Sequence, residues 1–158
     1  MNEQIGELSD QDKHVFEQMR SWLRGHFKKA EEGKYDTIEG KLCVVDAILR
    51  NGWLDKNNAW QLQALGLGFG DAISQQLGMS WTIITDSDGS VPALVFRGTS
   101  LKLFAFTAIQ KRMAMDEPVD VFPLFDAFCS LVERRRPKSF LERLSSQVIW
   151  LLRQRSAK

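Results

Sequence analysis

The stretch AWQLQALGLGFGDAISQQL, residues 59–77, decides how this chain folds. Its apolar side chains recur at three- and four-residue spacing, which predicts one long helix. Asn57 and Asn58 can cap the start of this helix, and Gly78 stands where helices commonly end. The expected buried face consists of Trp60, Ala64, Leu65, Phe69, Ala72, Ile73 and Leu77.

Three glycines, Gly66, Gly68 and Gly70, interrupt this helix. A glycine inside a helix lowers the stability of the helix by about 1 kcal/mol relative to alanine. Close approach of another helix or of a sheet is the expected compensation, which places the helix at the centre of the domain. A dinucleotide loop needs G-x-G-x-x-G between a strand and a helix. The spacing G-x-G-x-G inside a helical stretch does not meet that requirement, so we expect no phosphate loop.

Helical periodicity also predicts several other helices. The first begins at a capping pair formed by Ser9 and Asp12. Pro137 is expected to stop the helix that Asp120 caps. The expected helices cover residues 10–32, with an end near Gly33, residues 38–49, with a cap near Gly52, and residues 107–115. A further helix is expected after Asp120, with the apolar stripe Phe122, Phe125, Cys129 and Val132. The last expected helix is basic and covers residues 139–155.

Between these helices the period changes to that of strands. Residues 80–85 are rich in β-branched and aromatic side chains, and residues 86–90 (DSDGS) form a strong turn signal. Residues 91–97 complete a hairpin with an expected loop of four or five residues, and residues 101–106 are a possible third strand. The predicted fold class is α+β, with five or six helices packed around a small antiparallel sheet of two or three strands. We expect a single domain over residues 1–158, with residues 1–8 frayed.

Composition restricts the class of protein. The chain has 158 residues, of which 44% are hydrophobic and 26% are charged, so a disordered chain is excluded. Its two cysteines, Cys43 and Cys129, are too few for a disulfide scaffold. No apolar run has the length of a membrane span, and the N-terminus is polar and acidic. These features lead us to expect a cytoplasmic protein.

The charge is unevenly distributed along the chain. Residues 133–158 hold eight Lys and Arg against two Glu, a net charge of +6, whereas the residues before them hold 13 basic and 18 acidic side chains, a net charge of −5. Two interpretations of this basic tail are open: it is a helix face exposed to solvent, or it is a site that binds an acidic partner. Its strongest cluster is Arg134, Arg135, Arg136 and Lys138.

Motifs for metal and nucleophile chemistry are weak. Asp86 and Asp88 resemble the start of a calcium loop, but the sixth position from Asp86 is Val91 and the twelfth is Arg97. His14 and His26 are twelve residues apart on one expected helix, and no cysteine has a neighbouring cysteine at ligand spacing. Both thiols are expected to be buried and inert. The sequence therefore predicts no metal site and no cofactor.

Two residues attract separate hypotheses. Asp71 follows the glycines on a helix that should be buried, so it needs a charged or hydrogen-bonding partner. Structural pairing with an Arg or Lys and a catalytic role are both open. Trp53, in the loop after Gly52, serves either as an exposed interface anchor or as a lid on the core. The predicted interaction residues are Trp53, Asp71, Asp86, Asp88 and Arg97.

The run from Trp60 to Asp71, WQLQALGLGFGD, resembles a bacterial family described as domain of unknown function 3806. In that family a W-x-L-Q-x-L-G-x-x-F-G-D helix precedes a Trp-containing strand, a D-x-x-G turn, a further strand and a helix with a Lys-Arg pair. The matching parts are Trp81, Asp86 to Gly89, residues 92–96 and residues 109–112, and Ala105 departs from the expected proline. The resemblance covers residues 58–125. It implies a bacterial origin and one compact fold, and the family has no established activity that could be transferred to this chain.

The leading functional hypothesis is a non-enzymatic, protein-binding domain. Its sharpest form is an immunity-type protein that neutralises a basic toxin by covering it, because an acidic body steers a basic partner. One alternative is an enzyme with a dispersed polar site, in which Asp71 pairs with Arg97 or Arg112. The other is binding of a nucleic acid through the basic tail, against which the near-neutral total charge of +1 counts.

Overall fold

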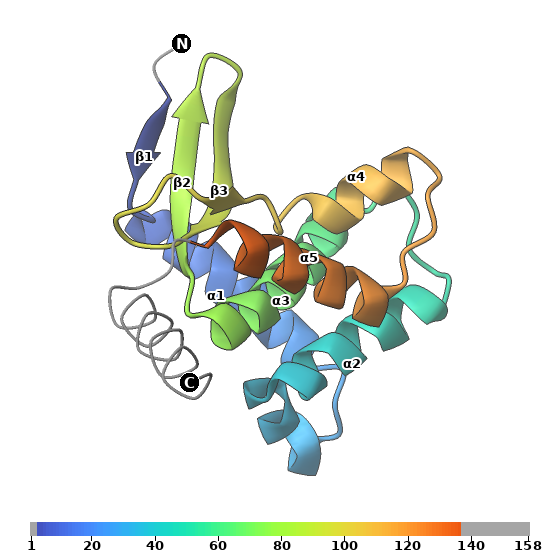
Figure 1. The fold of residues 1–158 in the computed structure, drawn as a ribbon. Helices are drawn as coiled ribbons and strands as arrows, with labels where there is room; N and C mark the ends of the chain where they lie inside the picture. The colour runs from blue at the N-terminus through green and yellow to red at the C-terminus, as the bar shows by residue number, and fades with distance from the viewer. Residues whose placement is uncertain (1–2, 137–158) are drawn as a thin grey trace, which may run out of the picture.

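A four-stranded antiparallel sheet and six helices make up residues 3–136, the part of the chain that the computed structural model describes. The strands are β1 (Gln4–Gly6), β2 (Ser80–Asp86), β3 (Gly89–Val95) and β4 (Lys102–Leu103), in the order β1-β2-β3-β4 (Figure 1). The α+β class is confirmed, with four strands rather than two or three. The helices are α1 (Asp10–Arg24), the 3-10 helix η1 (Lys29–Asp36), α2 (Ile38–Arg50), α3 (Ala59–Leu77), α4 (Ala108–Ala114) and α5 (Val121–Arg135).

The central helix is α3, which packs against α1, α2, α4 and α5 (Figure 1). Its glycines lie where neighbours come closest. A Cβ on Gly66 would lie 1.9 Å from the backbone oxygen of Phe106, and one on Gly70 would lie 2.4 Å from the ring of Trp81. At Gly68 the neighbour is Leu23, 2.8 Å away. The expected compensation for helical glycines is confirmed, because no larger residue leaves room for these contacts.

The first strand, β1, lies within the segment that the sequence predicts to be frayed. It pairs with β2 in the register Gln4↔Thr85 to Gly6↔Ile83. All three residues of β1 are exposed, so the strand lacks the alternation of buried apolar and exposed polar side chains by which a strand can be predicted from the sequence.

The β2–β3 hairpin is tighter than expected. Asp86 pairs with Gly89, so the loop contains two residues, Ser87 and Asp88, rather than four or five. The backbone N–H of Asp88 donates to the Asp86 carboxylate at 2.8 Å, and Gly89 takes a φ of +135° that favours glycine. The predicted loop is too long because the polar residues Asp86 and Ser90 are paired in the strands rather than part of the turn.

Helix α1 begins as predicted and ends earlier. Ser9 and Asp12 form the expected capping box, but the helix stops at Arg24 and Gly25 serves as its C-cap. The expected end near Gly33 is wrong, because the chain turns at residues 25–28 and continues as η1. This turn brings Tyr35, which is 1% exposed, into the core.

The remaining predictions for the helices are mostly confirmed. Helices α2, α3 and α4 match their expected ranges, and α5 follows Asp120. On α5 the predicted stripe residues Phe125, Cys129 and Val132 are buried. At its start the buried residue is Val121 rather than Phe122, which is 39% exposed and does not belong to the apolar stripe. None of the helices within residues 3–136 combines the length and apolar character of a membrane span. The expected helix over 139–155 lies outside the described residues.

Candidate functional site

The carboxylate of Asp71 occupies the most connected polar position in the described structure. It accepts two hydrogen bonds of 2.8 Å from Nε and Nη2 of Arg20 on α1. The indole N–H of Trp81 on β2 donates to Oδ1 at 2.9 Å, and the hydroxyl of Tyr35 on η1 donates to Oδ2 at 3.3 Å. Asp71 therefore ties three other elements to α3.

These contacts identify Asp71 as a structural group. The residue is 8% exposed, and four donors occupy its oxygens, which leaves it poorly placed to accept a proton from a substrate. The expected pairing with a basic side chain is confirmed, but the partner is Arg20 rather than Arg97 or Arg112. Its burial contradicts the prediction that Asp71 contacts a binding partner.

The partners of Asp71 have shifted pKa values. The hydrogen bond to Asp71 raises the pKa of Arg20 above its ordinary value, against the opposing effect of burial. Burial raises the pKa of the Tyr35 hydroxyl, and the nearby Asp71 charge raises it further. Tyr35 therefore stays protonated and continues to donate to Asp71 at any pH that proteins normally meet.

Three tryptophans meet at the surface and form what we call the tryptophan surface, which consists of Trp22, Trp53 and Trp60. Trp22 on α1 contacts both others edge to face, with ring centroids 6.4 Å from Trp53 and 5.7 Å from Trp60. Trp53 is 51% exposed and Trp60 is 38% exposed. Trp53 is thus an exposed residue rather than a lid, and the expectation that Trp60 lies in the core is wrong, because it stands in the first turn of α3.

A hollow of about 620 Å³ lies beside this surface. Its walls are Trp60 and four polar residues of α1, namely His14, Glu17, Gln18 and Ser21. These four residues follow three- and four-residue spacing, so they share one exposed face of α1. At the other end of the surface, His26 contacts Trp22 with a centroid distance of 4.6 Å.

The other predicted interaction residues do not join the tryptophan surface. Asp86 and Asp88 are exposed at the tip of the β2–β3 hairpin, and Arg97 is exposed after β3. The hairpin tip lies far from the α2–α3 loop that carries Trp53 (Figure 1). These predicted interaction residues therefore occupy separate parts of the surface, and the structure does not bring them together in one site.

The basic cluster is only partly described. Arg134, Arg135 and Arg136 are exposed at the C-terminal end of α5, and the Arg136 guanidinium lies 5.5 Å from the ring centroid of Phe96. Lys138 lies outside the described residues. The three arginines form a basic helix end that solvent reaches.

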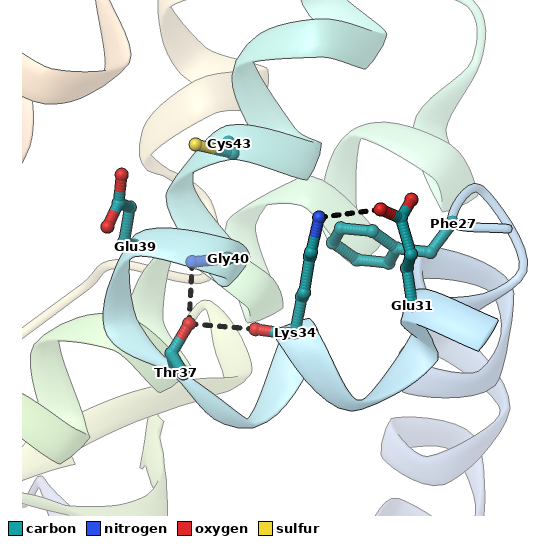
Figure 2. Close-up of a pocket in the computed structure, with 7 residues that line it drawn as sticks. All are labelled: Phe27, Glu31, Lys34, Thr37, Glu39, Gly40 and Cys43. Atoms are coloured by element: carbon teal, nitrogen blue, oxygen red, sulfur yellow. Dashed lines mark hydrogen bonds and ion pairs between the residues drawn. The ribbon is translucent and has the colours of Figure 1, made fainter.

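A pocket of about 500 Å³ contains one of the two thiols (Figure 2). Lys34 and Glu31 point toward each other across one side and form an ion pair of 2.7 Å, while Cys43 and Glu39 lie on the other side. Cys43 is exposed, which corrects the expectation of a buried thiol, whereas Cys129 is buried as expected. Partial burial, Glu39 and Asp46 raise the pKa of Cys43, so its thiol is protonated at neutral pH and is a weak nucleophile.

Within the described part of the chain, no three His, Cys, Asp or Glu side chains gather in an arrangement that could hold a metal ion. The polar clusters that do form consist of ion pairs and hydrogen bonds among the chain's own residues. The most distinctive exposed feature is therefore the tryptophan surface.

Comparisons with known proteins identify a sequence family and a related fold. A family model described as domain of unknown function (DUF3806) matches residues 41–125, which extends the resemblance toward the N-terminus. A crystal structure from Bacteroides thetaiotaomicron VPI-5482 shares the fold with a TM-score of 0.62 at 11% sequence identity. The alignment covers 80% of this chain and 47% of that chain, so this chain spans about half the length of the solved structure. No curated protein matches the sequence.

Proposed function

We propose that this chain, which belongs to the DUF3806 family of domains of unknown function, binds a protein partner on the tryptophan surface. The observation that carries the proposal is the exposure of Trp53 and Trp60, at 51% and 38%, which both contact Trp22. Covering apolar surface yields about 25 cal/mol for each Å² removed from water. A partner that covers two indole rings therefore gains substantial binding free energy.

The surroundings of the two rings suit a protein interface. Tryptophan is enriched among the residues that dominate binding energy, and such residues are commonly ringed by polar side chains that exclude water. Here His14, Glu17, Gln18 and Ser21 line the hollow next to Trp60. A side chain of the partner can enter this hollow while its neighbours cover the indoles.

The polar groups of the fold favour a binding role over an enzymatic one. Asp71 is occupied by Arg20, Tyr35 and Trp81, and the raised pKa of Cys43 keeps its thiol protonated. Neither group has the free, activated form that acid–base or nucleophilic catalysis requires.

A narrower form of the proposal concerns the partner's charge. Residues 1–132 hold 13 basic and 18 acidic side chains, a net charge of −5, which favours encounter with a basic protein. An immunity-type role, in which the chain neutralises a basic toxin, fits this charge. A cytoplasmic setting is part of the proposal, because Cys43 and Cys129 are free thiols.

Affinity capture from a lysate of the native host, with the tagged full chain as bait, tests this function. A double variant, Trp53→Ala with Trp60→Ala, removes both exposed indoles. Phe104→Ala is the matched control, because Phe104 is 39% exposed and lies outside the tryptophan surface. Circular dichroism verifies that each variant is folded.

We expect a stoichiometric protein that survives high salt, is retained by Phe104→Ala and is lost by the double variant. Equal recovery by all three baits would contradict the proposed surface. An acidic protein as the captured partner would overturn the narrower, immunity-type form and leave the binding role intact.

A further inference from the structure

Lys41 on α2 is a buried cation that forms no ion pair with any residue between 3 and 136. The residue is 8% exposed, and its Nζ donates to Oε1 of Gln75 on α3 at 2.9 Å. No carboxylate within residues 3–136 forms a salt bridge with this ammonium group. A buried charge without a directly bonded counter-ion is unfavourable, and the described carboxylates Asp71 and Asp36 act on Lys41 without forming an ion pair with it. An anionic ligand at this position would supply that counter-ion.

The surrounding side chains hold Lys41 in place. Nε2 of Gln75 donates to the backbone oxygen of Asp36 at 3.2 Å, which turns Oε1 toward Lys41. The Lys41 ammonium lies 5.1 Å from the ring centroid of Tyr35. An ammonium group has three N–H donors, and Gln75 uses one of them. The others remain for a ligand.

Arg24 brings a second cation to the same ring. Its guanidinium carbon lies 5.1 Å from the Tyr35 centroid, and Nη1 donates to Glu17 at 2.9 Å. A guanidinium has five N–H donors, so this ion pair leaves others for a ligand. Arg20, by contrast, is engaged by Asp71 through two hydrogen bonds.

These groups line an open pocket of about 220 Å³ among α1, η1, α2 and α3. Its carboxylates are Asp71, whose oxygens are occupied, and Asp36, which forms no salt bridge with Lys41. The pocket shares no residue with the tryptophan surface. Its volume suits a small ligand or the charged end of a larger one.

We propose that this pocket binds a small oxyanion, a carboxylate or phosphate group, through Lys41 and Arg24. The oxyanion accepts hydrogen bonds from both cations, each of which lies 5.1 Å from the centroid of the Tyr35 ring. Charge-assisted hydrogen bonds of this kind are the strong ones. The ligand supplies the direct ion pair that none of the described carboxylates forms with Lys41.

The protonation of Lys41 fits this role. Burial lowers its pKa, and the charges of Arg24 and Arg20 lower it further, while Asp71 and Asp36 act in the opposite direction. A bound anion opposes the lowering and stabilises the ammonium form. Binding should therefore weaken as the pH rises through the lowered pKa of Lys41.

Nuclear magnetic resonance titration of the full-length, isotope-labelled chain tests the site. Inorganic phosphate and acetate are added separately at constant ionic strength and neutral pH. We expect saturable shifts of the Lys41 and Gln75 amide signals and of the Arg24 Nε signal, with a dissociation constant of about 1 mM for at least one of the two anions. Phosphate alone would identify a phosphorylated ligand class, and acetate alone a carboxylate class.

Variants separate this site from general anion binding. Lys41→Gln and, independently, Arg24→Gln should each weaken binding about tenfold. Lys34→Gln should leave it unchanged, because Lys34 is exposed and paired with Glu31. Shifts that stay linear in concentration for both anions, shifts spread over exposed lysines, or unchanged affinity in Lys41→Gln would each overturn the proposal. The wild-type titration decides the matter even if one variant does not fold.

Discussion

Two hydrogen bonds of 2.8 Å join the guanidinium of Arg20 to the carboxylate of Asp71 and fix α1 against α3. The pair is separated by 51 residues in the chain. Trp81 and Tyr35 complete the carboxylate's set of donors, so one side chain determines how four elements meet. The stability of the fold should depend on this carboxylate more than on any surface ion pair.

Asp71→Asn should lower the free energy of unfolding by about 3 kcal/mol. The amide keeps the shape of the carboxylate but removes its charge, and its NH₂ group cannot accept from Arg20 or Trp81. Urea unfolding measures the loss. The control is Asp46→Asn, which breaks an exposed pair with Arg50 and should cost about 0–1 kcal/mol. Equal losses in the two variants would contradict the structural role of Asp71.

Gly66→Ala should destabilise the protein by about 3 kcal/mol, although alanine is the better helix former. Its Cβ would lie 1.9 Å from the backbone oxygen of Phe106, which cannot move without shifting the chain before α4. Gly33→Ala is the control, because no atom lies within 4 Å of its Cβ position. It should be neutral or stabilising by up to about 1 kcal/mol. Thermal unfolding of both variants measures the difference in stability. If Gly66→Ala were as stable as the wild type, the close contact of α3 with the chain before α4 would be contradicted.

The protein should lose stability at alkaline pH through Tyr35. Its pKa in the folded state is raised above the ordinary value of 10.0, so the folded state keeps the proton when the unfolded chain releases it. The stabilising contribution is complete below that value and is lost as the pH rises above it. Tyr35→Phe removes this contribution, so its unfolding free energy should fall less steeply there.

The measurement for Tyr35 is unusually clean. The chain contains one tyrosine, so the ultraviolet absorbance of tyrosinate reports this hydroxyl alone. We expect the absorbance to rise together with unfolding. Ionisation of Tyr35 in the folded protein at its ordinary pKa would show that burial and Asp71 do not act on it.

Cys43 and Cys129 should differ in reactivity. Cys43 is exposed, and its raised pKa predicts labelling by a thiol reagent that is slower than that of a free cysteine at neutral pH. Cys129 is buried, and its pKa is raised to about 11, so it should react only on unfolding. Mass spectrometry counts the labels with time, and Cys43→Ser should abolish labelling of the native protein. Rapid labelling of both thiols would contradict the packing of α5.

Much of the fold could be predicted from local pattern. Helix α3 matches residue 59 to residue 77 because its long apolar run is bounded by Asn58 and Gly78. Its burial followed from the glycines, since only close packing explains three of them in one helix. The end of α1 could not be predicted in this way, because the apolar spacing continues to Phe27 while the chain already turns at Gly25.

The site was harder to predict than the fold. Helical periodicity places Trp60 on the apolar face of α3 but does not reveal that its position in the first turn leaves it 38% exposed. The partner of Asp71 is set by tertiary packing between distant segments, so Arg97 and Arg112 were no worse candidates on sequence grounds than Arg20. The burial of Lys41 could not be predicted from the sequence, because a single lysine next to an apolar stripe has the same sequence pattern as a lysine exposed to solvent.

Site-specific photo-crosslinking inside the native host addresses the docking surface without purification. A photoreactive phenylalanine analogue replaces Trp53 in one full-length chain and Phe104 in another. If a partner docks on the tryptophan surface, light should produce one discrete adduct from position 53 and none of the same mass from position 104. The same adduct from both positions, or none from position 53 while a partner is still captured, would contradict binding on the tryptophan surface.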